Sequence, residues 1–358
     1  MKRIHVLTGG FKGANGSAFL YPFVRHRRAL LDVGLDVKIL TKAGGSTANC
    51  DLLFVDSKYF RVRTAADQDL LLSLLSEFAE STTLWWFDTT DSTGTLQSKH
   101  LDVVSRYYKA QLLRDRSLYT SGLYGDRIYS DYYHRAFGID DKDTPRVGPP
   151  LTDAQLAKLH VSWNSGMGDY SLRGALYARA YARTKFRPLI RAPRRWTPPS
   201  QSREFPLSGR FGIGHRRATV RYQRQRIRDL IGEQVSTHKI SRRKFLEELR
   251  HSFAVVSPFG WGEITLRDFE IFINGGLLIK PDMSHLETWP PLYENHETYL
   301  GFRWDFSNLN ETIDWVQSNL AEAEEIAIEG QRNYKAFLAD PWGQEQFVMR
   351  LHAMVSTI

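Results

Sequence analysis

Short apolar runs alternate with longer stretches of helical periodicity in the first half of the chain. Four apolar runs predict buried strands, at 4–7, 35–40, 51–56 and 82–88. A glycine-rich loop and a helical stretch from about residue 17 follow the first run, and 68–80 has the period of an amphipathic helix. Strands that alternate with helices predict βαβ units and a parallel sheet.

The second half repeats this alternation after a stretch rich in proline and arginine at 191–209, which we interpret as a linker. Helices are predicted before it at 151–163 and 170–186. After it, a strand and turn are predicted at 208–214, helices at 216–232, 241–252, 308–320 and from about 321, and strands at 253–258 and 277–279. The chain is therefore expected to hold two α/β units.

Length, charge and cysteine content narrow the class of protein. A chain of 358 residues is long enough for two or three domains. Its net charge of +8 favours an anionic partner, and peripheral contact with an anionic membrane is one such role. A single cysteine, Cys50, fits a reducing compartment, and the N-terminal apolar run is too short for a signal peptide. We therefore expect a cytoplasmic protein.

The stretch 257–281 combines a glycine-bearing turn, a helix with charged residues, a Gly-Gly stop and an apolar strand. Its markers are Gly262-Glu263, Arg267, Phe269-Glu270, Gly275-Gly276 and 277–279. This pattern resembles the donor-binding half of GT-B glycosyltransferases, especially the group-1-like and spore-envelope-type families. Many retaining members carry two glutamates with seven residues between them, whereas six separate Glu263 from Glu270 here.

The resemblance implies two Rossmann-like domains that face each other across a cleft. Residues 1–204 would form the acceptor-side domain and 205–325 the nucleotide-sugar domain, and 326–358 would pack back on the first. The implied reaction moves a sugar from a nucleotide-sugar donor to a hydroxyl of a glycan or lipid-linked glycan. No metal or other cofactor is expected, because helix ends and basic side chains neutralise the diphosphate, and no nucleic-acid partner is expected.

The same stretch supplies the candidate donor site. The helix is expected to carry Glu263, Arg267 and Glu270 in its first turns, and at about 100° per residue these three side chains share one face. The resemblance assigns Glu270 to the ribose and Arg267 with Glu263 to the phosphates or the sugar. Further donor-site candidates are Gly260, Gly262, Lys280, Arg216 and Arg217, the last two facing the leaving diphosphate. The alternative is an ordinary Glu–Arg pair on a solvated helix face.

The first half supplies acceptor-side candidates at the carboxyl ends of its strands, where open α/β sheets bind ligands. In the glycine-rich loop, Gly10, Asn15 and Ser17 are candidates for contact with sugar or diphosphate, unless the loop is a plain tight turn. After the strand at 82–88, either Asp88 or Asp91 could accept the proton of the acceptor hydroxyl. The alternative for both aspartates is helix capping or an Asx turn.

Two basic stretches leave a choice of roles. The Tyr- and Arg-rich stretch 105–137 would suit an acceptor site, or form an amphipathic helix followed by an ordered loop. The arginines at 221–228 are predicted to form a solvated basic face.

Asp141 and Asp143 have D-x-D spacing but lie in a proline-bearing loop, where no metal site is expected. The rival hypothesis is a non-catalytic protein that binds nucleic acid or a nucleotide sugar.

Overall fold

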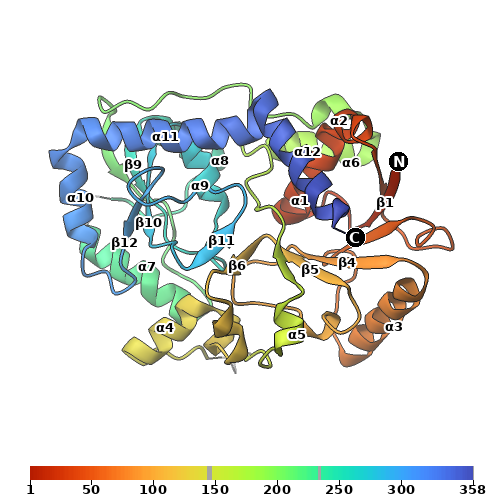
Figure 1. Ribbon diagram of the computed structural model, residues 1–358. Coiled ribbons are helices and arrows are strands. Elements are labelled where there is room, and N and C mark those ends of the chain that lie inside the picture. The colour runs from red at the N-terminus through yellow and green to blue at the C-terminus, as the bar shows by residue number, and fades with distance from the viewer. Residues whose placement is uncertain (143–146, 233–234, 358) are drawn as a thin grey trace.

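The computed structural model describes residues 1–142, 147–232 and 235–357, and contains two halves, each built around a parallel β-sheet (Figure 1). The first sheet has the strand order β2-β1-β3-β4-β5-β7, with all neighbours parallel. Its strands are β1 (Lys2–Leu7), β2 (Leu35–Leu40), β3 (Leu52–Asp56), β4 (Thr83–Asp88), β5 (Arg106–Lys109) and β7 (Leu159–Val161).

Helices cover both faces of the first sheet. The helices of this half are α1 (Gly13–Arg25), α2 (Arg27–Asp32), α3 (Ala65–Ser81), α4 (Ile128–Phe137), α5 (Asp153–Leu156) and α6 (Gly174–Thr184). On one face, Phe19 and Phe23 of α1 pack with Ile4 and Phe54 of the sheet. The other face packs against α3, which is why the strands are apolar on both sides.

The second sheet has the order β12-β10-β9-β8 and is also parallel. Its strands are β8 (Phe205–Ser208), β9 (Ser252–Val256), β10 (Leu277–Pro281) and β12 (Leu300–Phe302). Its helices are α7 (Ala218–Ile231), α8 (Arg242–Arg250), α9 (Leu266–Ile273) and α10 (Leu309–Ser318). The interior strands β9 and β10 are buried at every position.

The last two helices connect the second half back to the first. Helix α11 (Leu320–Ala339) runs along the second half, and α12 (Pro341–Ser356) lies over the first sheet (Figure 1). Phe347 and Leu351 of α12 are fully buried in the core on the α1 face. The C-terminal helix therefore crosses back as predicted.

Two further contacts join the halves. Strand β6 (Gln111–Leu113), from the first half, pairs antiparallel with β11 (Leu286–Thr288), from the second. Helix α4 packs against α7, where Gln223 donates a hydrogen bond of 3.1 Å to the hydroxyl of Tyr133. The predicted α/β fold of two Rossmann-like halves with a returning C-terminal helix, the GT-B arrangement, is confirmed by this topology.

The elements depart from the predictions where local patterns are weak. The stretch 151–163 was predicted to be one helix but forms the short helix α5 and the strand β7. The stretch 105–137 contains strands β5 and β6 before the helix α4, where a long amphipathic helix was the alternative. Both strands are short and carry polar residues, so no period of two is visible in them.

Candidate functional site

A cleft of about 370 Å³ lies between the two halves. The first half contributes residues at the carboxyl ends of β1, β3 and β4, and the second contributes the loop between β9 and α9. The lining residues are Lys12, Gly13, Ala14, Asn15, Gly16, Lys58, Asp91, Gly260, Trp261, Gly262, Ile264, Thr265 and Leu266. This is the position at which the alternating α/β pattern predicted a ligand site.

Helix α1 presents its N-terminus to the cleft. Lys12, the residue before the helix, makes no side-chain cap, and the first turn, residues 13–16, lines the cleft with the positive end of the helix dipole. Gly10 adopts a φ of +82°, which turns the chain from β1 towards α1. Gly10 and Ser17 belong to this loop–helix unit but lie outside the set that lines the cleft, whereas Asn15 lines it.

Asp91 is the carboxylate among the lining residues. It accepts a hydrogen bond of 2.7 Å from the side-chain amide of Asn15, which also donates to the carbonyl of Thr89. Asp91 also lines a smaller adjoining hollow with Gln111 and Asn164. It therefore borders both the cleft and the smaller hollow.

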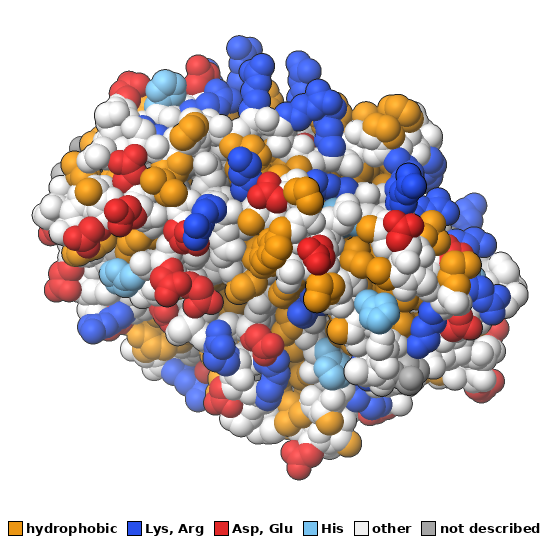
Figure 2. All heavy atoms as spheres, turned by 45° about the horizontal axis from the view of Figure 1, so that its top comes forward, with side chains coloured by type: hydrophobic (Ala, Val, Ile, Leu, Met, Phe, Trp, Pro, Cys, Tyr) orange, Lys and Arg blue, Asp and Glu red, His pale blue; other side chains and the backbone are white. Residues whose placement is uncertain are grey.

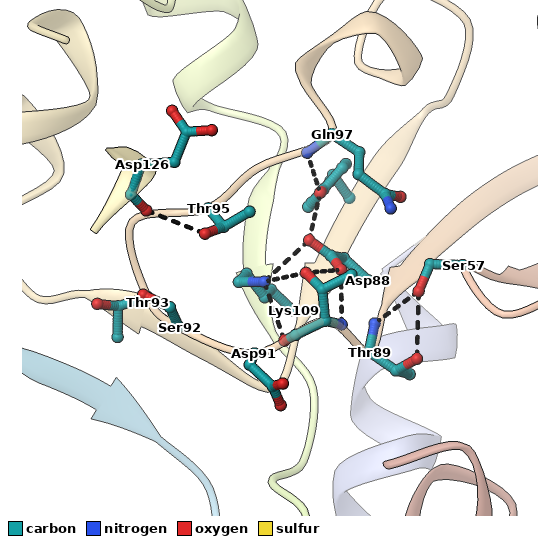
Figure 3. A network of polar contacts seen from close by, with 12 residues as sticks. Ser57, Asp88, Thr89, Asp91, Ser92, Thr93, Thr95, Gln97, Lys109 and Asp126 are labelled. Carbon is teal, nitrogen blue, oxygen red and sulfur yellow. Dashed lines mark hydrogen bonds and ion pairs between the residues drawn. The ribbon is translucent and has the colours of Figure 1, made fainter. Parts of the chain in front are cut away.

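Asp88 has a structural role, and the prediction that it could act as the base is wrong. Its side chain is fully buried and pairs with Lys109 at 2.9 Å, and Tyr107 donates a further hydrogen bond of 2.7 Å. Burial opposes its ionisation, but Lys109 and these hydrogen bonds outweigh burial and lower its pKa. In Figure 3 Asp91 points away from this pair, so the two aspartates occupy different environments.

Glu263 is not a cleft residue, and the predicted shared face with Arg267 and Glu270 is wrong. Helix α9 begins at Leu266, so Glu263 lies in the preceding turn. Its buried carboxylate reaches across to the first half, where it accepts hydrogen bonds from Ser92 Oγ at 3.1 Å and from Thr93 Oγ1 at 2.8 Å.

The same carboxylate also accepts a hydrogen bond of 3.1 Å from the backbone N–H of Thr93, and His285 Nε2 lies 3.9 Å away. Burial alone would raise the pKa of Glu263. The contacts with His285 and Thr93 outweigh burial and lower the pKa to about 2. Glu263 is therefore a charged tie between the two halves.

Glu270 and Arg267 lie on α9, behind the cleft-lining loop. Glu270 is 4% exposed and pairs with Arg242 of α8, although burial still raises its pKa. Arg267 donates to the carbonyl of Arg210 at 2.9 Å, and its buried Nε has no hydrogen-bond partner. Burial lowers the pKa of Arg267. The role of Glu270 at a ribose stays a prediction.

Arg224 lies beside the cleft-lining loop, whereas the sequence predicted a solvated basic face for it. It instead turns inward from α7 and donates to the carbonyls of Phe211 at 3.0 Å and Phe259 at 3.3 Å. Burial, followed by the positive charge of Arg267, lowers its pKa to about 10. A Cβ added to Gly260 would lie 3.8 Å from Arg224 Nη2, so this guanidinium stands directly behind the cleft.

Gly260 and Gly262 line the cleft, and at Gly262 the chain approaches other groups too closely for a side chain. A Cβ on Gly262 would lie 2.8 Å from the backbone nitrogen of Ser92, across the interface between the halves. Lys280, in contrast, is fully buried in β10 and pairs with Asp268 at 3.1 Å. The prediction that Lys280 contacts phosphate is therefore wrong.

Trp261, at the rim of the cleft, is surrounded by cationic groups. The guanidinium of Arg127 lies 3.4 Å from the centre of its ring and that of Arg217 lies 5.2 Å away. Arg217 also approaches Asp141 at 3.8 Å, at the start of α7, and Arg216 is exposed beside it. Asp143 lies outside the described residues.

No protein-family model matches the sequence, and no curated protein matches it. Among solved structures the chain is similar to an alpha-glucosyltransferase in complex with UDP-glucose and DNA containing an abasic site, with 11% identity, a TM-score of 0.45 and full coverage of both chains. It is also similar to Anabaena Alr3699/HepE in complex with UDP, with 9% identity, a TM-score of 0.46 and full coverage of both chains.

Across the described residues, helices that are both long and apolar enough to traverse a bilayer are absent.

Proposed function

We propose that the protein is a glycosyltransferase, which moves a sugar from a nucleotide-sugar donor to a hydroxyl of a glycan or lipid-linked glycan. One observation carries the proposal: the cleft is lined by two lysines, Lys12 and Lys58, and one carboxylate, Asp91, and a guanidinium lies directly behind it. Arg224 is that guanidinium, behind Gly260, and Asp91 accepts a hydrogen bond from Asn15.

The cationic groups in and behind the cleft suit a diphosphate. Arg224 and Arg267 donate to backbone carbonyls, and these bonds hold the two guanidiniums close together. Two neighbouring cations repel each other, and a bound dianion would relieve that repulsion. Lys12 and the open N-terminus of α1 complete the positive lining from the first half.

The proposed chemical step is a direct displacement. The acceptor oxygen attacks C1 of the donor sugar while its proton passes to a carboxylate oxygen of Asp91. The bond between C1 and the diphosphate oxygen breaks, and the nucleoside diphosphate leaves with the electron pair. Arg224 and Arg267 stabilise the negative charge that develops on the diphosphate. Glu270 can accept hydrogen bonds from the ribose hydroxyls in this scheme only if its ion pair with Arg242 breaks or leaves one carboxylate oxygen available.

A panel of UDP-, GDP-, CMP- and dTDP-sugars tests the donor site by thermal shift. A matching donor at about 100 times its Kd should stabilise the fold by about 2.7 kcal/mol. Arg224→Gln should abolish the shift, whereas Arg226→Gln, an exposed arginine on the same helix, should retain it.

Release of nucleoside diphosphate with a hydroxyl acceptor tests the reaction. Absence of any shift in the panel would refute the donor site. A shift without turnover across candidate acceptors would favour the nucleotide-sugar-binding alternative.

A further inference from the structure

The positive charge of this protein is concentrated in one surface segment, residues 170–203, which we call the basic segment. It contains nine basic residues and no Asp or Glu: Arg173, Arg179, Arg183, Lys185, Arg187, Arg191, Arg194, Arg195 and Arg203. The rest of the chain holds 39 basic and 40 acidic residues, so the segment accounts for the whole net charge of +8. A surface so biased attracts a polyanionic partner.

Helix α6 forms the first part of the basic segment and lies on the surface, with exposed side chains along one side. Of its residues only Gly174 is buried. The exposed side consists of Leu176, Arg179 and Arg183. Their spacing of i, i+3 and i+7 places them along one side of the helix.

The later part of the basic segment is an extended chain that leads to β8 (Phe205–Ser208). This extended chain runs along the top of the molecule in Figure 1. Figure 2 turns the top of the molecule towards the viewer, and many Lys and Arg side chains lie along the upper edge of this view.

Large apolar side chains are exposed among these cations. Leu172 is 43% exposed, Leu176 57% and Phe186 60%. Phosphate backbones attract the arginines but gain nothing from exposed leucine and phenylalanine. A bilayer interface accommodates both, because lipid headgroups meet the cations while the apolar side chains enter the acyl boundary.

We propose that the basic segment is a docking surface for a membrane that contains anionic lipids. The proposal concerns a surface outside the cleft and is independent of the glycosyl transfer proposed above. Tyr181 of α6 meets Phe11 edge-on, with ring centres 4.9 Å apart, and Phe11 precedes the cleft residue Lys12. Docking through α6 would therefore bring the mouth of the cleft close to the membrane.

Co-sedimentation of the full chain with vesicles tests the docking surface directly. Vesicles of phosphatidylcholine with phosphatidylglycerol should bind the protein, pure phosphatidylcholine should not, and added salt should weaken binding. The double variant Arg179→Glu/Arg183→Glu should weaken binding by more than about tenfold.

The charge-matched control Lys99→Glu/Arg226→Glu changes exposed residues on other elements and should bind like the wild type.

The apolar contribution is tested by Leu176→Ser/Phe186→Ser, which should also weaken binding to anionic vesicles by about tenfold. Leu70→Ser, at a leucine of α3 that is 60% exposed, is the matched control. Equal binding to neutral vesicles, or unchanged binding of both double variants, would overturn the proposal. Tighter binding to duplex DNA than to vesicles, insensitive to Leu176→Ser/Phe186→Ser, would overturn it in favour of a nucleic-acid surface.

Discussion

Replacement of Glu263 by glutamine isolates the charge of the tie between the halves. Glutamine has the shape of the protonated carboxyl group, so Glu263→Gln imitates protonation and keeps the volume. The pKa of Glu263 falls from 4.5 to about 2 in the folded protein, which corresponds to about 3 kcal/mol of stability at neutral pH. The loss is expected because the amide cannot accept every hydrogen bond that Ser92 and Thr93 donate.

The sign of the pH dependence follows from the direction of the shift. A carboxyl group whose pKa is lowered by folding stabilises the protein above its unfolded pKa and loses that contribution as the pH falls through the folded pKa. The stability difference between wild type and Glu263→Gln should therefore be full at pH 7 and shrink between about pH 5 and about pH 2.

Urea unfolding followed by tryptophan fluorescence measures this difference at each pH. Glu297→Gln, at an exposed glutamate of the second half, is the control and should stay within about 0.5 kcal/mol of wild type. A difference below about 1 kcal/mol at pH 7, or one that does not change with pH, would refute the reasoning.

Three further substitutions test the proposed base, the buried Asp88–Lys109 pair and the close contact at Gly262. Asp91→Asn should lower kcat by about 10²–10⁴ while the thermal shift with donor persists; unchanged turnover would remove Asp91 as the base. Lys109→Met should destabilise the fold by about 3–5 kcal/mol in thermal or urea unfolding, because it leaves Asp88 buried and unpaired, and a neutral effect would contradict that pairing. Gly262→Ala should lower the urea midpoint of unfolding, because its Cβ would lie 2.8 Å from the backbone nitrogen of Ser92. An unchanged midpoint would contradict this and show that the two halves can move apart at this contact.

The alternating pattern was sufficient to predict the two-sheet architecture, because β1, β3, β4, β9 and β10 are buried runs whose apolar character does not depend on their neighbours. Strands with polar residues were missed. Lys109 in β5 is polar yet fully buried, because Asp88 on the neighbouring strand neutralises it. Such a pairing depends on strand order, which local sequence does not encode.

The position of the cleft was predicted from the sequence, but its lining only in part. Gly260, Gly262 and Asp91 line it, because turn residues after strands lie at the carboxyl edge of a sheet. Arg224 was missed among the arginines of α7, because the residues that accept its hydrogen bonds, Phe211 and Phe259, come from other loops. Glu263 was misassigned because Thr265 and Asp268 form a capping box, so α9 starts three residues after Glu263.

The β6–β11 ribbon sets how the two halves can move. Its backbone hydrogen bonds connect residues 111–113 to 286–288, so separation along that line would break several of them at once. Relative motion of the halves is then expected to pivot about the ribbon and to change the width of the cleft, which Lys12 lines from one half and Leu266 from the other. Amide hydrogens of the ribbon should exchange with solvent more slowly than those of the Gly260–Gly262 loop.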